Sequence, residues 1–238
     1  MIITFLSDTH TKHRNISEEI PGGDIIIHAG DLMNSGYVSQ DMVNFLQWYK
    51  LLPYTLRVFI AGNHDRIIEN HPFTSTKIIN GFGDGCVYLQ DESIITMQSE
   101  YKSTYVPETG VKIYGSPWQP EFFNWAFNLP RMGDELKNKW NAIPKDTDIL
   151  ITHSPPFGTL DTVNSYTKHL GCELLAERVD IIKPKIHVFG HIHGGNGIEQ
   201  KNGTLFINAA VLNENYKYTN APITIDFDFE TLEYKIIT

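Results

Sequence analysis

The sequence predicts an α/β protein built on two β-sheets. Its first half alternates short apolar runs with a stretch of helical periodicity, which is the order of parallel strands joined by crossover helices. Its middle holds closely spaced β-branched runs separated by turn residues, a pattern typical of antiparallel strands. Strand and helix patterns then alternate again. Because no repeat or Ser/Gly linker divides the chain, we interpret residues 1–238 as one domain.

The first quarter of the chain predicts a parallel sheet. Strands buried on both faces are expected at Ile2–Leu6, Ile25–Ala29 and Arg57–Ala61, because these runs are short and rich in Ile, Val and Phe. A helix is expected at Gln40–Leu51, where apolar residues recur at helical spacing. This strand, helix, strand order favours right-handed parallel crossovers.

The middle segment predicts antiparallel strands at Val87–Leu89, Ser93–Gln98 and Val111–Tyr114. The stretch that follows, Ser116–Gly133, is irregular and contains three prolines and several Trp and Phe residues. Irregular segments of this length in a compact domain are commonly functional, so we expect an ordered functional loop.

The remaining elements alternate between helix and strand. Helices are expected at Glu135–Trp140 and Glu173–Asp180, and strands at Asp148–Thr152 and Ile186–Phe189. The last three strand-like runs are expected to form a meander. They are Gly203–Asn208, Ile223–Phe227 and Tyr234–Ile237.

Composition excludes several classes of protein. With 41% hydrophobic and 12% aromatic residues the chain is not disordered, and with only Cys86 and Cys172 it is not stapled by a disulfide framework. The net charge of −9 argues against long nucleic acids and anionic lipid as partners. No apolar run reaches the length of a membrane helix or of a signal peptide, so we expect a cytoplasmic protein with no membrane partner.

Five predicted strands are each followed by residue types that bind metals. Because ligands in an open α/β sheet bind outside the carboxyl ends of the strands, we expect these side chains to meet at one edge. Their imidazole, carboxylate and amide donors suffice for two cations, which a shared carboxylate can hold about 3.5–4 Å apart. In chain order they are Asp8, His10, Asp31, Asn63, His153, His191 and His193.

Each motif alone has an ordinary structural explanation, since Asp-x-His arises by chance and Asn or Asp often caps a helix. Their joint occurrence at strand ends decides the interpretation. The motifs are Asp8-x-His10, Gly30-Asp31, Gly62-Asn63-His64-Asp65, His153 and Gly190-His191-x-His193. This series resembles the signature of the calcineurin-like metallophosphoesterase superfamily. Gly115–Pro120 and Phe127–Arg131 resemble more closely the metallophosphoesterase-domain-containing brain proteins, a subgroup of class III cyclic-nucleotide phosphodiesterase type.

The resemblance covers nearly the whole chain and implies a four-layer sandwich of two mixed β-sheets flanked by helices. It also implies two divalent metal ions, with Mn²⁺ expected and Fe, Zn, Ni or Mg accepted by the same donors. The implied ligand sets are Asp8, His10 and His193 for one metal, Asn63, His153 and His191 for the other, and Asp31 as the bridge.

We therefore expect a phosphodiesterase that hydrolyses a small phosphodiester, with a cyclic nucleotide as the leading candidate. A hydroxide bridging the two metals would attack phosphorus. His64, which follows ligand Asn63 but is not itself a ligand, would protonate the leaving group as general acid. Asp65 is expected either to orient His64 or to cap a helix.

Residues outside the motifs give less specific expectations. Trp118, Phe122 and Phe157 could stack a nucleobase or simply pack their loops. Arg131 could bind a phosphate or form an ordinary ion pair. The histidines without motif context are expected to be structural or exposed. They are His13, His28, His71, His169 and His187.

Three alternatives compete with this function. A phosphomonoesterase or protein phosphatase and a nuclease would use the same metal-binding residues, although the acidic composition argues against long nucleic acids. A non-catalytic interaction module is the third alternative. It is disfavoured because every metal position and His64 are present. No motif predicts an oligomeric state.

Overall fold

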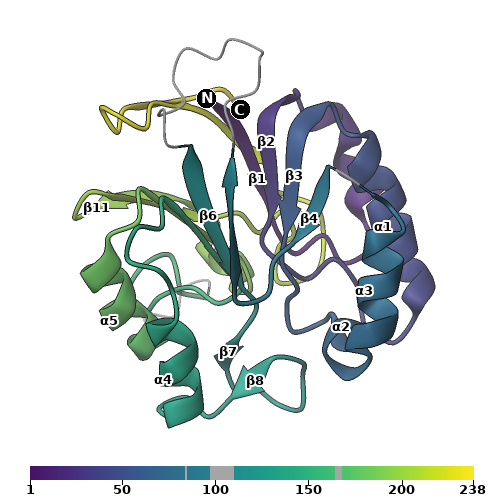
Figure 1. Ribbon diagram of the computed structural model, residues 1–238, viewed down its shortest axis with the longest axis horizontal. Helices are drawn as coiled ribbons and strands as arrows, with labels where there is room; N and C mark the ends of the chain where they lie inside the picture. The colour runs from purple at the N-terminus through teal and green to yellow at the C-terminus, as the bar shows by residue number, and fades with distance from the viewer. Residues whose placement is uncertain (84, 97–109, 164–167) are drawn as a thin grey trace.

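Two mixed β-sheets pack face to face, and helices cover both outer faces (Figure 1). The structure is a computed structural model that describes residues 1–83, 85–96, 110–163 and 168–238. None of the helices in these ranges has the length and apolar character of a membrane span. The predicted four-layer arrangement of two sheets and flanking helices is confirmed.

The first sheet has four parallel strands at its centre and one edge, and two antiparallel strands at the other edge. In order across the sheet they are β14 (Tyr234–Ile236), β13 (Ile223–Phe227), β1 (Ile2–Leu6), β2 (Gly23–His28), β3 (Tyr54–Phe59) and β4 (Cys86–Tyr88). Helices α1 (Ser39–Leu51), α2 (Arg66–Asn70) and α3 (Pro72–Asn80) lie on the side of this sheet that Figure 1 shows at the right.

The second sheet has four parallel strands flanked by an antiparallel strand at each edge. They are β11 (Gly197–Lys201), β12 (Thr204–Asn208), β10 (Ile186–Phe189), β9 (Ile149–Thr152), β6 (Val111–Ser116) and β5 (Glu92–Thr96). Helices α4 (Asp134–Asn141) and α5 (Glu173–Ile182) cover it. Two short 3-10 turns, η1 (His13–Glu19) and η2 (His193–Gly195), lie in loops, and β7 (Gln119–Pro120) pairs with β8 (Asn128–Leu129).

Alternating side chains on the strands build three apolar layers, because successive residues of a strand point to opposite faces. In β9, Ile149 and Ile151 pack between the two sheets, whereas Leu150 packs under α4 and α5. On the first sheet, α1 buries Phe45 and Tyr49 against the outer face. Both central groups of strands are thus buried on both faces, as the apolar runs predict.

Two predicted strand groupings were wrong. The three middle strands do not pair together, because β4 lies parallel to β3 in the first sheet while β5 and β6 form an antiparallel pair in the second. The cause is an unpredicted helical connection, α2 and α3, which turns β3 and β4 into another parallel unit. The end of the predicted Ser93–Gln98 strand, residues 97–98, lies outside the described residues.

The predicted C-terminal meander was also wrong. β12 joins the second sheet beside β10, where it forms a hairpin with the unpredicted β11, while β13 and β14 add to the first sheet next to β1. The Ser116–Gly133 segment is ordered, as expected, and its course is set by the β7–β8 pair.

Candidate metal centre

The carboxyl ends of parallel strands from both sheets meet at one site. Asp8, Asp31 and Asn63 follow β1, β2 and β3 of the first sheet, and His153 and His191 follow β9 and β10 of the second. The expectation that ligand residues meet at the carboxyl ends of parallel strands therefore holds even though the strands belong to two different sheets. Together with His10 and His193, these side chains form what we call the ligand cluster.

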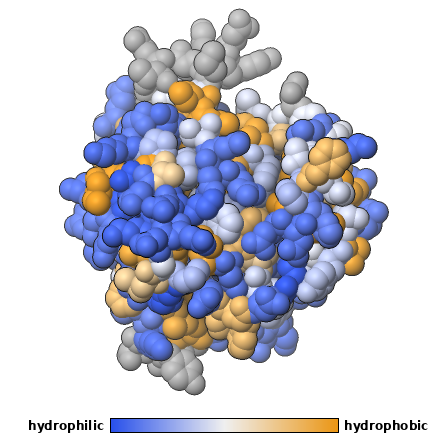
Figure 2. Space-filling view, turned by 60° about the horizontal axis from the view of Figure 1, so that its bottom comes forward, coloured by the Kyte–Doolittle hydropathy of each residue, from blue (hydrophilic) through white to orange (hydrophobic). Residues whose placement is uncertain are grey.

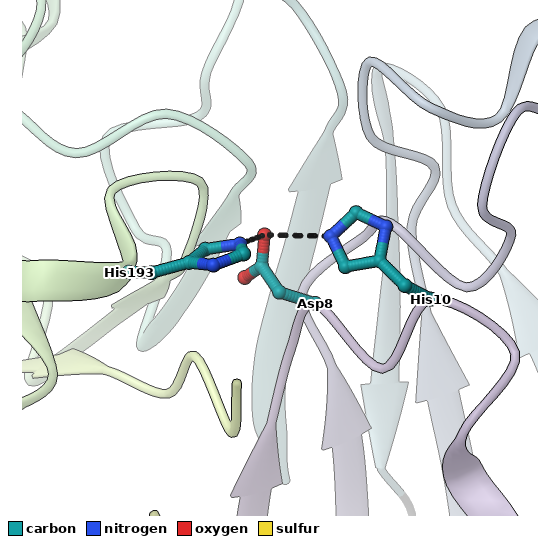
Figure 3. A group of neighbouring side chains, drawn as sticks. All are labelled: Asp8, His10 and His193. Atoms are coloured by element: carbon teal, nitrogen blue, oxygen red, sulfur yellow. Dashed lines mark hydrogen bonds and ion pairs between the residues drawn. The ribbon is translucent and has the colours of Figure 1, made fainter. Parts of the chain in front are cut away.

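One part of the cluster places a carboxylate between two imidazoles (Figure 3). Asp8 Oδ1 lies 3.3 Å from His193 Nε2 and 4.0 Å from His10 Nε2. The carboxylate is fully buried and also accepts the backbone N–H of His191. This group has the donor types and spacing for one cation.

A second carboxylate lies centrally. Asp31 Oδ2 is 3.7 Å from His10 Nε2 and 3.4 Å from His153 Nε2, so it faces donors from both sheets. On the far side, Asn63 Oδ1 lies 2.9 Å from His153 Nε2 and 2.8 Å from His191 Nδ1. The seven predicted side chains are therefore brought together, with Asp31 in the middle.

Backbone carbonyls fix which nitrogen three of the histidines present. Because a carbonyl can only accept, Nδ1 of His10 donates to Met33 O and Nδ1 of His153 donates to Ala29 O. The same bond joins His193 Nδ1 to the carbonyl of residue 213. Each neutral ring therefore turns an Nε2 lone pair toward the cluster, which is the arrangement typical of metal-ligating histidine.

These donors fit a cation. His10 Nε2 is buried and has no hydrogen-bond partner among the described residues. Around Asn63 Oδ1, His153 Nε2 and His191 Nδ1 both lie within hydrogen-bond distance, so two ring nitrogens and an amide oxygen of the types that bind divalent ions converge at one point. A divalent ion satisfies all of them at once.

The electrostatics of the cluster lead to the same conclusion. Burial opposes a charge on His153, but the Asp31 carboxylate outweighs it and raises the pKa of His153 to about 9. Burial also opposes a charge on His193, yet its bond to Asp8 raises that pKa to about 9. The two buried carboxylates thus attract positive charge strongly enough to overcome desolvation, as metal-binding carboxylates must.

Four members of the cluster have backbone in the left-handed region. The φ angles are 57° for Asp8, 41° for His10, 58° for Asp31 and 66° for His191. Such conformations cost about 1–3 kcal/mol each and persist where the surroundings impose them. Here the Asp8 N–H donates to the Gly30 carbonyl and the His10 N–H to the Asp31 carbonyl, each at 3.0 Å.

Two of the motif glycines are needed because a ligand carboxylate lies directly against their backbone. A Cβ on Gly62 would lie 2.3 Å from Asp31 Oδ1, and a Cβ on Gly190 would lie 2.1 Å from Asp8 Oδ2. Only glycine leaves space for the carboxylates at these positions.

His64 lies beside the cluster and faces a cavity. Its Nδ1 donates to the Asn34 carbonyl, and its backbone N–H donates to Asp31 Oδ1 at 2.7 Å. One ring nitrogen lies within 4.8 Å of donor atoms of His10 and Asp31. His64 is thus held close to the ligands by two separate hydrogen bonds.

Asp65 has a role that neither sequence expectation describes. Its carboxylate is fully buried and accepts four backbone N–H groups, so it fixes the turn after β2 instead of orienting the imidazole or capping α2. Burial and the Asp31 carboxylate raise the pKa of Asp65 to about 8, while the N–H bonds favour its ionised form. The donors are Gly62 (2.7 Å), Asp31 (3.0 Å), Met33 (3.0 Å) and Leu32 (3.3 Å).

A pocket of about 600 Å³ opens over the ligand cluster. Besides ligands, it is lined by His64, Arg66 and five aromatic side chains that we call the aromatic wall. The wall consists of Tyr37, Phe122, Phe123, Trp125 and Tyr216. On the face shown in Figure 2, hydrophobic patches interrupt a largely hydrophilic surface. A second cavity, of about 760 Å³, lies between α3 and β4, away from the cluster.

Comparison with known proteins identifies the family. The model of the calcineurin-like phosphoesterase family matches residues 1–195. This chain belongs to that family. Human metallophosphoesterase domain-containing protein 1 is 39% identical over 241 residues, which cover 93% of this chain and 69% of the human protein.

Two solved structures share the phosphoesterase fold. The Thermus thermophilus protein TT1561 superposes with a TM-score of 0.64 at 14% identity, covering 99% of this chain and 97% of that one. Phosphopantetheinyl hydrolase from Mycobacterium tuberculosis superposes with a TM-score of 0.56 at 13% identity, covering 90% of each chain. Family membership and the ligand cluster together support a metal-dependent phosphoesterase.

Trp118, for which the sequence allows either substrate stacking or packing, does not line the pocket over the ligand cluster. Its indole N–H donates to Asp91 Oδ2 at 2.8 Å, and the Lys139 amino group lies 4.3 Å from the ring centroid. In the Ser116–Gly133 segment, Trp118 therefore packs against the second sheet and α4. Phe122, from the same loop, does line the pocket.

The other two residues predicted to contact substrate, Phe157 and Arg131, also make contacts within the protein. Phe157 packs against His169, with ring centroids 5.2 Å apart. Arg131 pairs with Glu173 at 3.0 Å and donates to the Gly171 carbonyl, which is the ordinary ion pair considered as its alternative. Neither residue lines the pocket over the cluster.

Sequence reasoning missed Trp125, Tyr216, Arg66 and Tyr37. Trp125 lies in the Ser116–Gly133 segment that was expected to be a functional loop, but the sequence gives no reason to prefer it over Trp118 as a pocket residue. Tyr216, whose ring centroid is 4.9 Å from that of His10, has no motif. The remaining histidines lie outside the cluster, with three buried and two exposed. They are His13, His28 and His187, and His71 and His169.

Proposed function

We propose that this phosphoesterase is a dinuclear metal phosphodiesterase that acts on a small phosphodiester, with a cyclic nucleotide as the leading substrate. The observation that carries the proposal is the position of His64. Its imidazole lines the pocket beside the ligand cluster, while its Nδ1 is bonded to the Asn34 carbonyl. A phosphodiester needs such a proton donor, because its departing oxygen is a poor leaving group when unprotonated.

The ligand cluster would hold two divalent ions, which we propose to be Mn²⁺. When bound, such ions supply an activated water and neutralise the charge of the phosphate. Asp8, His10 and His193 would hold one ion and Asn63, His153 and His191 the other, with Asp31 between them.

His64 then acts on the leaving group. Because its Nδ1–H donates to a carbonyl in both protonation states, the proton available for transfer is the one on Nε2. Asp65 acts indirectly, because its carboxylate fixes the turn that carries Asp31. We therefore assign His64 as the general acid and Asp65 as a positioning residue.

The pocket supports a small and partly aromatic substrate. Its volume of about 600 Å³ suits one nucleotide-sized molecule, and the aromatic wall offers faces for stacking. Arg66 adds one cationic side chain to the lining of the pocket. These features favour a small diester over a folded phosphoprotein or a long nucleic acid, which an acidic protein also disfavours.

A substrate panel tests the proposal. Stripped protein is reloaded with Mn, Fe, Zn, Ni or Mg and assayed against cyclic nucleotides, bis-nitrophenyl phosphate and nitrophenyl phosphate. We expect metal-dependent hydrolysis with a higher kcat/KM for the diesters. A preference for the monoester would contradict the proposal, and metal binding without hydrolysis of any ester would favour an interaction module.

A further inference from the structure

We propose that Trp125 is a positioning residue that keeps the His64 imidazole in its proton-donating orientation, with Arg66 packed against the same indole. The inference rests on the proposed function. Trp125 belongs to none of the metal-binding motifs, but its ring is in direct contact with that of His64.

The contact is a face-to-face stack. The ring centroids of Trp125 and His64 are 4.0 Å apart and the ring planes make an angle of 27°. Arg66 Cζ lies 4.5 Å from the Trp125 centroid and 5.1 Å from the Tyr37 centroid. Arg66 thus joins Tyr37 to the stack of Trp125 and His64.

Stacking supplies a restraint that hydrogen bonding alone does not. The bond from His64 Nδ1 to Asn34 fixes one direction in the ring plane, yet the ring can still tilt about that direction. His10 meets His64 edge-on, at 4.6 Å and 81°. A flat contact on the ring face, as Trp125 provides, is what fixes the tilt and so the direction of Nε2.

Trp125 is itself tied to the segment that carries His64. The Ala126 N–H donates to the Asn63 carbonyl at 3.1 Å, and the Phe127 N–H donates to Glu69 Oε1 at 2.9 Å. The indole and the imidazole therefore share one frame, and a shift of the loop would move both.

A different role, stacking a substrate base, suits other members of the aromatic wall better. One face of Trp125 is occupied by His64, and Arg66 also packs on the indole. Phe122 and Phe123, in contrast, are 53% and 81% exposed. These two rings are available to a substrate, whereas Trp125 is engaged within the protein.

Two substrates that differ only in their leaving group test this role. Methyl phenyl phosphate releases a basic phenolate that needs a proton, whereas methyl nitrophenyl phosphate releases an anion that needs little help. If Trp125 positions the general acid, Trp125→Leu lowers kcat for the phenyl ester by about 10–100-fold, and the loss is at least about tenfold larger than for the nitrophenyl ester. Trp125→Phe, which can still stack, restores most of the activity.

Three controls separate the possible outcomes. Metal content and melting temperature show whether Trp125→Leu is folded and loaded. Phe123→Leu changes an aromatic residue of the same loop that is mostly exposed, and we expect the same factor for both esters. In a His64→Ala background, Trp125→Leu is expected to have no further effect on the phenyl ester, because the group it positions is gone.

An equal loss for both esters, or the same loss in the His64→Ala background, would overturn the inference. Failure of the proposed function gives a different result, because wild-type protein would then hydrolyse neither diester, or His64→Ala would respond equally to both leaving groups.

Discussion

The ligand cluster and the aromatic wall face the same pocket but are held in different ways. Ligands such as Asp8 and His153 are completely buried and bonded to backbone groups. In the wall, Tyr37 is 67% and Phe123 is 81% exposed, and both lie outside the strands. The strand ends thus hold the ligand cluster in place, whereas loops form the aromatic wall of the pocket.

The largest effect is expected from the centre of the cluster. Asp31→Asn keeps the shape of the side chain but removes the charge that faces both His10 and His153. We expect lower metal stoichiometry by elemental analysis and a fall in kcat of more than about 100-fold, because even outer partners of ligands cost 10–100-fold. Asp146→Asn, at an exposed ion pair, is the matched control. Unchanged metal content would show that Asp31 is not a ligand.

His64→Ala separates catalysis from metal binding. We expect wild-type metal content and a kcat lower by about 10²–10⁴-fold toward a diester with a poor leaving group. The exposed His169, altered in the same way, serves as control. A kcat close to that of wild type would remove His64 from the mechanism and leave the cluster without an identified acid.

Asp65→Ala tests how rigidly the cluster is supported. Four buried N–H groups would lose their acceptor, so we expect the free energy of unfolding to fall by about 3–5 kcal/mol in urea titrations. Asp228 makes the same kind of bond to the N–H groups of Glu230 and Thr231 in an exposed turn. Asp228→Ala should cost much less than Asp65→Ala, because water can replace the lost acceptor at an exposed turn. Equal costs would mean that the turn after β2 needs no such support.

The smallest effect is expected from the aromatic wall. Phe122→Ala removes one exposed ring, so KM should rise by about 5–100-fold while kcat stays within about twofold, as for the loss of one stacking contact. Phe73→Ala changes an even more exposed ring on α3 that does not line the pocket, and should change neither parameter. A large fall in kcat for Phe122→Ala would place the wall in the chemistry.

The same contrast explains how much of the site could be predicted from the sequence. Asp8, Asp31 and Asn63 each follow a buried apolar run, and the carboxyl ends of parallel strands meet, so their convergence follows from local patterns. The central strands could be predicted for the same reason. The metal-binding role of these side chains remains a prediction.

Contacts between distant segments could not be predicted. The partners of Asp65 lie more than 30 residues earlier as well as next to it, and nothing in its motif indicates that its carboxylate accepts backbone N–H groups there. Trp118 and Trp125 lie in the same irregular segment of the sequence, but only Trp125 lines the pocket. Likewise, the spacing of β4 and β5 contains no sign that they belong to different sheets.

The donor atoms of the ligand cluster come from both β-sheets. Asp31 extends from one sheet and His153 from the other, 3.4 Å apart. An ion held between them would add a further link between two layers that already contact each other through apolar side chains and through bonds such as that from His153 Nδ1 to the Ala29 carbonyl. By mass action, filling such a site at 100 times its Kd adds about 2.7 kcal/mol to the free energy of unfolding. The resistance of this protein to heat and urea would then report the free metal concentration around it, so chelators should weaken its tertiary structure as well as its catalysis.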